Sequence, residues 1–451
     1  MVCKVCKKEL DSPICSFCGE DNSKEFYAQN KSESTPSRIK NSRKLYGKKR
    51  KLRINFKRVF VLAVSLLVLI FAVRFVISLF KSDDSKSVKT EKTLFSSGML
   101  AVKSDGLWGY LSSDGKASYK IKPKFTLVTN FYGDFSFADI RGKFAMINKD
   151  GTAATMPDFD AVGKASANGL IPAKQGDLWG YINEYGTFVT DPKFTTASVF
   201  AENNIAAVSV SGSYGYIGED GEYVIAPQYD TAGDFSSDGF AAVSSDGKYM
   251  YIDADGNSLG ELTFDYACEF KNGFGCVKSC GDYGAVDSEG NMVIPAQFDK
   301  PFEFDANGYA KICVGGKYGI IDKSGNFVIN PRYRDLGDFN GENLTFAKRG
   351  DGKYGFIDMK DKFVISPEYN DAGNFSCGLA PVKSGESWGY INEKGETVID
   401  AKYSFATQFY SDGYACVADA DGGYMIIDTD GKNVFADSLK IQSVMLGDFA
   451  K

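Results

Sequence analysis

Residues 317–333 read KYGIIDKSGNFVINPRY, and this stretch is one copy of a pattern that fills most of the chain. An aromatic anchor, here Tyr318, is followed by Gly or another small residue and then by a β-rich run. The anchor returns every 34 to 36 residues. A fixed period of this length indicates a repeat architecture, in which neighbouring copies stack to share a core.

The repeat keeps its phase at three positions. The ten anchors are Trp108, Phe144, Trp179, Tyr214, Tyr249, Tyr283, Tyr318, Tyr354, Trp388 and Tyr424. Seven residues after them stand the turn residues Gly115, Gly151, Gly186, Gly221, Gly256, Gly290, Gly325, Asp361, Gly395 and Gly431. Fifteen residues after eight of them stand the second aromatics Phe159, Phe194, Tyr229, Phe264, Phe298, Tyr333, Tyr369 and Tyr403.

The copy around Tyr318 predicts a small meander of about three strands. Residues 309–314 and 318–322 are β-prone runs, and residues 326–329 return as a third. Gly325 closes the hairpin between the last two, because Gly adopts the positive φ that such a loop needs. Pro331 has no N–H to donate, so we expect it to end the pairing before Tyr333.

The Gly after each anchor leaves room for a neighbouring backbone or ring to approach closely. Ala145, Met250 and Met425 replace it in three copies. We therefore expect these three copies to pack less regularly than the others.

The repeats predict an all-β array of about ten three-stranded units over residues 95–451. One such meander is at best marginally stable alone, and stacking supplies the missing core. Aromatic residues make up 14% of the chain, and we expect most of them to pack between units. The array is an open superhelical stack or is propeller-like. The open stack is favoured, because closed propellers normally have four strands per blade and rarely more than eight blades.

Three segments carry a resemblance to a known family: Trp108-Gly109-Tyr110, Trp179-Gly180-Tyr181-Ile182 and Trp388-Gly389-Tyr390-Ile391. Together with the turn Gly and a Val-Ile-x-Pro-x-Tyr tail, they make residues 95–435 similar to the bacterial WG-repeat, or KWG-repeat, family. The resemblance implies a β-rich repeat array and a bacterial source. The family has no settled biochemical activity, so the resemblance implies architecture rather than chemistry.

The first 21 residues contain two CxxC pairs, Cys3 with Cys6 and Cys15 with Cys18. Four thiolates at this spacing suit the tetrahedral coordination of a structural Zn²⁺, and the segment looks like the short zinc ribbon of many bacterial membrane proteins. Two disulfides or a redox pair are the alternative, and the compartment decides between them. A four-cysteine site has no open position, so we expect no catalysis there.

Residues 22–58 begin polar and end with eleven Lys or Arg and no acid between Arg38 and Arg58. Residues 59–80 are apolar apart from Ser65, Arg74 and Ser78. Such a run forms about 33 Å of helix, enough to cross a bilayer. The basic block then marks the cytoplasmic side, and a nucleic-acid arm is the less favoured interpretation. Residues 81–94 are a linker to the repeat domain.

Charge differs between the two sides of the expected helix. Residues 1–80 contain 17 Lys or Arg and six Asp or Glu, whereas the rest contains 35 and 52. An acidic repeat domain disfavours binding to nucleic acid or to anionic wall polymers. We expect a single-pass cell-membrane protein with a cytoplasmic N-terminus and an extracytoplasmic repeat domain.

Six further cysteines lie in the repeats: Cys268, Cys276, Cys280, Cys313, Cys377 and Cys416. Cys276 and Cys280 are close enough in sequence to consider a disulfide. We expect most of the six to be small buried residues, and the sequence leaves their disulfide status open.

Catalysis is not expected. The chain has no His, which removes the commonest general base and every Ser-His or Cys-His pair. Gly256-Asn257-Ser258-Leu259-Gly260 matches G-x-S-x-G, but Gly256 is a turn residue of the repeat rather than part of a strand-to-helix elbow. Asp253-Ala254-Asp255-Gly256 and Asp428-Thr429-Asp430-Gly431 suggest calcium loops, yet they lack the late Glu and fall in hairpin turns.

The sequence therefore predicts an interaction or scaffold module that binds an envelope or surface protein. The alternative is a module that binds cell-wall glycan through exposed aromatic residues, with Trp108, Trp179 and Trp388 as candidates. Zn²⁺ in the N-terminal ribbon is the expected cofactor. No nucleic-acid partner is expected.

Overall fold

A computed structural model describes residues 93–114, 118–156, 158–339, 342–436 and 438–447. The expected zinc ribbon at 1–21, the tether at 22–58 and the apolar run at 59–80 lie outside these residues, as does most of the linker. Within the described ranges no helix has the length and hydropathy needed to cross a bilayer.

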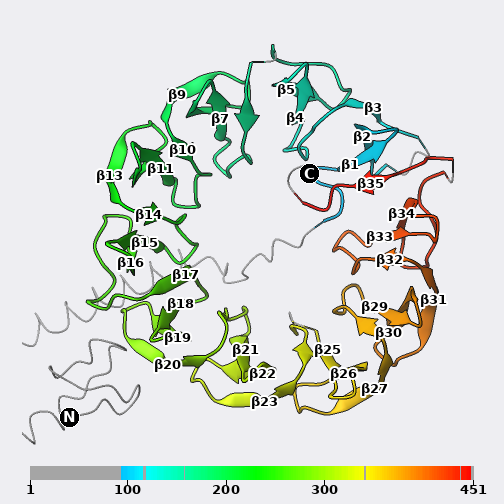
Figure 1. Ribbon diagram of the computed structural model, residues 1–451. Coiled ribbons are helices and arrows are strands. Elements are labelled where there is room, and N and C mark those ends of the chain that lie inside the picture. The colour runs from blue at the N-terminus through cyan, green and yellow to red at the C-terminus, as the bar shows by residue number, and fades with distance from the viewer. Residues whose placement is uncertain (1–92, 115–117, 157, 340–341, 437, 448–451) are drawn as a thin grey trace, which may run out of the picture. The chain divides into compact units, whose positions relative to one another are not determined.

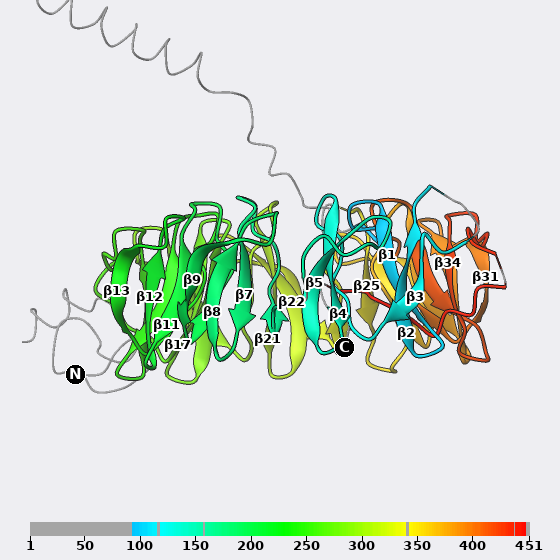
Figure 2. The same ribbon diagram turned by 90° about the horizontal axis from the view of Figure 1, so that it is seen from above.

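Ten small antiparallel sheets contain all 35 strands of the described residues, and Figure 1 shows them set around a ring like the blades of a propeller. Seen from the side in Figure 2, the strands run between the two faces of the ring. Six of these sheets have four strands, three have three, and one has two. The all-β repeat is confirmed, and the array is a closed ring rather than the favoured open stack.

Each sheet is built from up to four successive strands, which we number within each unit. The first strands are β6 (Ala161–Val162), β10 (Thr196–Ala197), β14 (Thr231–Ala232), β17 (Tyr266–Lys271), β24 (Asp335–Leu336), β28 (Asp371–Ala372) and β32 (Phe405–Ala406). The second strands are β1 (Met99–Ser104), β4 (Phe135–Ile140), β7 (Ile171–Gln175), β11 (Ala206–Val210), β15 (Ala241–Ser245), β18 (Phe274–Ser279), β21 (Tyr309–Val314), β25 (Thr345–Lys348), β29 (Leu379–Ser384) and β33 (Ala415–Ala418).

The third strands carry the anchors, and the fourth strands lie on the outer rim in Figure 1. The third strands are β2 (Leu107–Ser112), β5 (Lys143–Asn148), β8 (Leu178–Ile182), β12 (Ser213–Ile217), β16 (Lys248–Ile252), β19 (Asp282–Asp287), β22 (Lys317–Asp322), β26 (Tyr354–Ile357), β30 (Ser387–Asn392) and β34 (Tyr424–Ile427). The fourth strands are β3 (Ile121–Phe125), β9 (Phe188–Phe194), β13 (Tyr223–Tyr229), β20 (Met292–Phe298), β23 (Phe327–Tyr333), β27 (Phe363–Tyr369) and β31 (Thr397–Tyr403). One short strand, β35 (Ser443–Val444), follows the tenth unit.

The predicted unit is confirmed in its main lines and extended by one strand. The three expected runs around Tyr318 correspond to β21, β22 and β23, and Gly325 has a φ of 78° in the hairpin. The additional strand is the short first strand, two residues long in most units. It forms directly after the second aromatic of the preceding unit, as Thr231 does after Tyr229.

The expectation that Pro331 ends the pairing is wrong. Ile320 pairs with Ile329 and Tyr318 pairs with Tyr333, so the single residue Gly319 of β22 lies opposite the three residues 330–332 of β23. Pro331 lies in the resulting bulge, where its missing N–H costs no ladder hydrogen bond. The anchor and the second aromatic therefore pair across the bulge, and Phe194, Phe298 and Tyr333 are buried.

The Gly after the anchor is required by the same bulge. A Cβ at Gly319 would lie 2.5 Å from the carbonyl oxygen of Ile329, and the equivalent Gly residues meet the same obstacle. In the units with Ala145, Met250 and Met425 the fourth strand is reduced to isolated bridges. The expected irregularity of these units is confirmed, and its cause is the loss of this close approach.

Five buried tyrosines, two residues after their anchors, join five of the ten units to the unit that follows. Each hydroxyl donates to a backbone carbonyl of the following unit at 2.6 to 2.9 Å: Tyr110 to Thr129, Tyr181 to Ser198, Tyr216 to Gly233, Tyr251 to Cys268, and Tyr390 to Thr407. Each ring also packs on a Phe of the following unit, as Tyr216 does on Phe235 with centroids 4.8 Å apart. We call these five residues the tyrosine ladder.

The end of the repeat domain closes the ring onto its beginning. Strand β35 pairs with β1 in antiparallel register, with Lys103 opposite Ser443. The Gly106 N–H donates to the Gln442 side-chain oxygen at 2.9 Å, and the Phe95 N–H donates to Asp412 at 3.0 Å. Apolar residues from both ends form one buried cluster. The far end of the chain thus supplies the strand in the first-strand position of the first unit.

The bulge can be tested with two glycines of the eighth unit. In Gly355→Ala the added Cβ would lie 2.6 Å from the Ile365 carbonyl oxygen, so we expect the free energy of unfolding to fall by about 1 to 3 kcal/mol. Gly350→Ala is the matched control, because nothing lies within 4 Å of its added Cβ. Urea unfolding of the full-length protein measures both, and equal midpoints for the two variants would contradict the account.

Candidate functional site

The three candidate tryptophans are mainly packing residues. Trp108 is only 3% exposed and belongs to a buried cluster. Trp179 and Trp388 are half-buried and pack against the clusters of their own joints. Trp108 is therefore not exposed as the glycan alternative requires, and it pairs with Phe125 on β3.

The motifs that resembled catalytic or calcium sites are turns. Gly256 has a φ of 83° in a hairpin. The Asp253 carboxylate accepts the N–H groups of Asp255 and Asn257 at 3.0 and 2.8 Å, and Asp428 does the same in the tenth unit. Over the residues that the structure describes, no group of three or more Cys, Asp or Glu is placed to hold a metal ion.

The six repeat cysteines divide by burial. Cys276, Cys313 and Cys416 are buried, Cys268 is half-buried, and Cys280 and Cys377 are exposed. Three of the six are therefore buried, whereas the sequence predicts burial for most of them. Cys280 lies just after the end of β18, with a φ of 57°. Cys276 lies on that same strand and not on the strand opposite Cys280.

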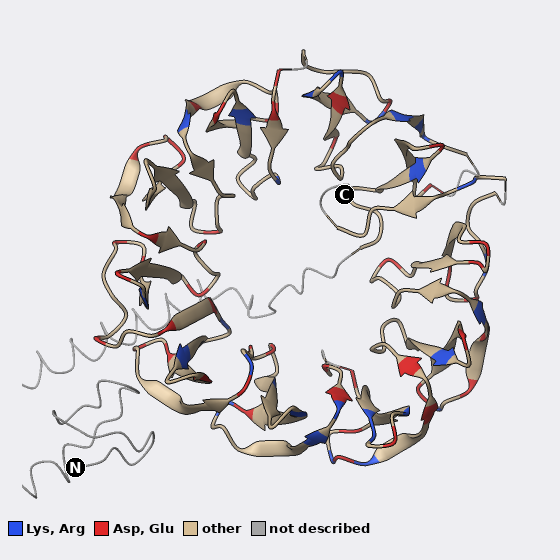
Figure 3. Ribbon diagram, in the orientation of Figure 1, with Lys and Arg blue, Asp and Glu red and all other residues tan. Residues whose placement is uncertain are grey.

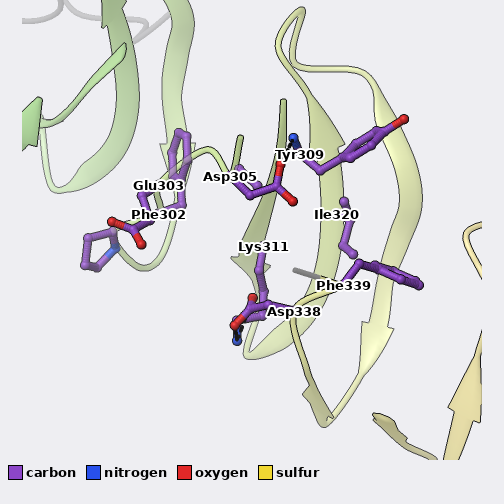
Figure 4. A pocket seen from close by; sticks show the side chains of 10 residues that line it. Phe302, Glu303, Asp305, Tyr309, Lys311, Ile320, Asp338 and Phe339 are labelled. Atoms are coloured by element: carbon purple, nitrogen blue, oxygen red, sulfur yellow. Dashed lines mark hydrogen bonds and ion pairs between the residues drawn. The ribbon is translucent and has the colours of Figure 1, made fainter. Parts of the chain in front are cut away.

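A hollow of about 230 Å³ lies at the joint between the seventh and eighth units. Figure 4 shows its lining: Phe302, Glu303 and Asp305 before β21, Lys311 on β21, Ile320 on β22, and Asp338 and Phe339 after β24. Phe302, Ile320 and Phe339 are buried and form an apolar wall. Charged side chains share the hollow with this wall.

The hollow lies at one of the five joints that lack a ladder tyrosine. At these joints the position is occupied by Met146, Ala285, Ile320, Phe356 and Ile426. Ile320 occupies the position two residues after its anchor, where Tyr216 and Tyr251 stand in the fourth and fifth units. Ile is smaller than Tyr and has no hydroxyl to donate across the joint. The space that a ladder ring occupies elsewhere is therefore only partly filled here.

Lys311 is a second departure from the repeat at the same place. It pairs with Ile320 on the second strand, where the other described units carry Ala101, Phe137, Pro172, Ala207, Ala242, Cys276, Phe346, Pro381 or Cys416. The Lys311 ammonium lies 3.2 Å from Asp338. The sequence predicts no site here by itself. When the second strands are aligned, Lys311 is the charged residue at an otherwise uncharged position.

The carboxylates around the hollow outnumber its cation. Asp305 is held by accepting the N–H groups of Asn307 and Tyr309, both at 2.9 Å. Glu303 is exposed and pairs with Lys271 at 3.1 Å. Asp338 pairs with Lys311, so three acids stand against two lysines, Lys271 and Lys311. The remaining negative charge favours a cationic group in the hollow.

Other surface features repeat around the ring and are less specific. Val189, Val224, Val293, Val364 and Val398 occupy equivalent places on the fourth strands and are 40% to 51% exposed. Figure 3 shows acidic and basic residues in every sector of the ring. The hollow at Ile320 differs because the charged Lys311 lies opposite Ile320, at a position that is uncharged in the other described units.

Comparison with known proteins agrees with the repeat. Six segments match the family described as "WG containing repeat": residues 179–213, 214–249, 283–318, 318–354, 354–386 and 388–419. These six segments are WG repeats, and the anchor in each begins or nearly begins the matched range. A search of curated proteins found no match to the chain.

Solved structures give distant likenesses. A crystal structure of a eukaryotic initiation factor is 13% identical with a TM-score of 0.49, covering 78% of this chain and 97% of that one. Kluyveromyces lactis Hsv2 is 10% identical with a TM-score of 0.32, covering 64% and 99%. The WD40 β-propeller domain of Doa1 is 13% identical with a TM-score of 0.26, covering 50% and 89%. At these values the likenesses assign no function, and the ring is defined by the strand pairing itself.

Proposed function

We propose that the repeat domain is a protein-interaction module and that a side chain of its partner enters the hollow at Ile320. The size of the hollow carries this proposal. At about 230 Å³ it is smaller than the pockets of roughly 300 to 1,000 Å³ that usually enclose small-molecule ligands. One large side chain is an occupant of suitable size.

The lining favours Arg or Lys as that side chain. The aliphatic stem of either residue packs well on apolar surface while its head keeps a polar partner, and Phe302 and Phe339 supply such a surface. Asp305 and Asp338 supply carboxylates, with which the guanidinium of Arg makes strong paired hydrogen bonds. Arg is also enriched among the residues that contribute most to protein interfaces.

We propose further that the repeat domain is extracytoplasmic and anchored in the membrane of a bacterial cell. Support comes from the sequence: the basic block at 38–58 precedes the apolar run at 59–80, as in proteins with a cytoplasmic N-terminus. The partner is then an envelope or surface protein. Nucleic acid is not a proposed partner, because the repeat domain is acidic. The role is binding rather than catalysis.

The partner can be captured by site-specific photo-crosslinking in cells. A benzoylphenylalanine placed at Glu303, on the rim of the hollow, is expected to give a discrete protein adduct. The same probe at Tyr185, which is 74% exposed in the third unit, is the control site. An adduct with wall glycan, or none at Glu303, would contradict the proposal.

A filled hollow provides the matched variant for that experiment. The double substitution Lys311→Ala and Ile320→Tyr reproduces the Ala207–Tyr216 pair of the fourth unit, so we expect folding to be retained. The crosslink from position 303 should fall at least tenfold. An undiminished crosslink in a folded variant would show that the hollow is not the contact.

The proposed topology has a separate test. Protease added to intact cells, or to spheroplasts where an outer layer intervenes, should remove the repeat domain and leave a fragment containing residues 1–58. Survival of the repeat domain under conditions that digest a known surface protein would place it on the other side of the membrane.

We propose that Cys3, Cys6, Cys15 and Cys18 bind one Zn²⁺. The support is the donor set, since four thiolates suit a closed tetrahedral site. Elemental analysis of the full-length protein should give one zinc per chain, lost in the Cys3→Ser, Cys6→Ser double variant. An unchanged zinc content in that variant would contradict the assignment.

A further inference from the structure

Cys268 and Cys276 face each other across β17 and β18. Ala267 pairs with Val277 and Phe270 pairs with Gly275, so Cys268 lies in a bulge opposite Cys276. Residues opposite each other on antiparallel strands project to the same face of the sheet. The half-buried Cys268 packs against the apolar cluster of this joint, and the buried Cys276 belongs to that cluster.

Equivalent positions in other units show that a side chain at the position of Cys268 reaches the strand opposite. Ser198 and Thr407 occupy the position of Cys268 in the fourth and tenth units. Their hydroxyl oxygens accept the N–H of the residue opposite, Ala207 and Cys416, both at 3.1 Å. The γ atom of a side chain at this position therefore lies within hydrogen-bonding distance of the backbone N–H of the residue across the sheet. In the sixth unit that residue is itself a cysteine.

The surroundings of the two thiols differ. The Cys276 thiol donates a hydrogen bond to Cys268, which lowers the pKa of Cys268. The same bond, together with burial, raises the pKa of Cys276. The Phe302 N–H also donates to the Cys276 sulfur, at 3.4 Å. Cys268 is thus the more accessible thiol and the one that ionises first, the properties of an attacking thiolate.

We propose that Cys268 and Cys276 are a dithiol pair that a disulfide oxidant closes into a cross-strand disulfide. The Cys268 thiolate attacks one sulfur of the oxidant, forms a mixed disulfide and releases the other half as a thiolate. Cys276 then loses its proton and attacks the Cys268 sulfur, which releases the second half of the oxidant. The two thiols lose two protons and two electrons, and the oxidant is reduced to two thiols.

This assignment replaces the Cys276–Cys280 disulfide that the sequence suggested for consideration. Tyr251 of the preceding unit donates its hydroxyl to the carbonyls of both Cys268 and Cys276, at 2.8 and 3.2 Å. A disulfide here would cross-link the sheet at a rung of the tyrosine ladder. The inference is independent of the hollow and of the identity of any partner.

Oxidised glutathione and trypsin test the pairing in the full-length protein. Trypsin cuts after Lys271 and Lys278, so Cys268, Cys276 and Cys280 fall on three different peptides. After oxidation and alkylation, mass spectrometry should find residues 249–271 linked to residues 272–278. The exposed Cys377 reports that the oxidant has acted. A link from Cys276 to Cys280, or two alkylated thiols at 268 and 276 after Cys377 has reacted, would overturn the proposal.

Two single variants test the order of attack. Cys276→Ser should accumulate a stable mixed disulfide with glutathione on Cys268, because the second thiol is missing. Cys268→Ser should leave Cys276 as a thiol, and it should fold because Ser198 occupies the same position in the fourth unit. The reverse pattern would overturn the assignment of Cys268 as the attacking thiol.

Discussion

The hydrogen bond from a buried tyrosine hydroxyl to the backbone of the next unit is the interaction on which the ring depends. It ties the third strand of one sheet to the segment that begins the next, as Tyr216 does with Gly233. Burial raises the pKa of Tyr216, so the hydroxyl keeps the proton that it donates. A buried carbonyl left without this partner costs about 1 to 3 kcal/mol. The same bond and the same ring contact recur at five joints. At each of these joints they fix the angle between two neighbouring sheets in the same way.

The proposed binding site lies at one of the five joints where this ladder is interrupted. At Ile320 the ring and the hydroxyl are both absent, and Lys311 stands on the opposite strand. The fold is stable there without the tyrosine because neighbouring joints hold their own geometry, as expected of an array whose units contact mainly their neighbours. A repeat array thus gains a specific site by changing two side chains at one joint, while the strands that carry them keep their register.

Much of the unit could be predicted from the sequence, because strand runs and the hairpin at Gly325 are set locally. The pairing beyond Pro331 could not, since a bulge lets a proline remain within a strand without breaking its ladder. Two-residue strands such as Thr231–Ala232 are too short for a periodic signal. Closure depends on small angles summed over ten joints, which no single segment encodes. The hollow was missed because Ile320 and Lys311 are informative only when the copies are compared. The burial of Trp108 could not be foreseen, because it depends on packing against residues far along the chain.

Ring closure is tested most directly by joining the two ends that the structure pairs. Lys103 on β1 lies opposite Ser443 on β35, and paired residues of antiparallel strands have Cα atoms about 4.5 to 5.5 Å apart, within the range of a disulfide. The double variant Lys103→Cys, Ser443→Cys should form an intramolecular disulfide between residues 103 and 443 on mild oxidation, identified by peptide mass spectrometry. A folded variant in which these two cysteines stay reduced, or link only between separate chains, would contradict the closed ring and favour an open stack.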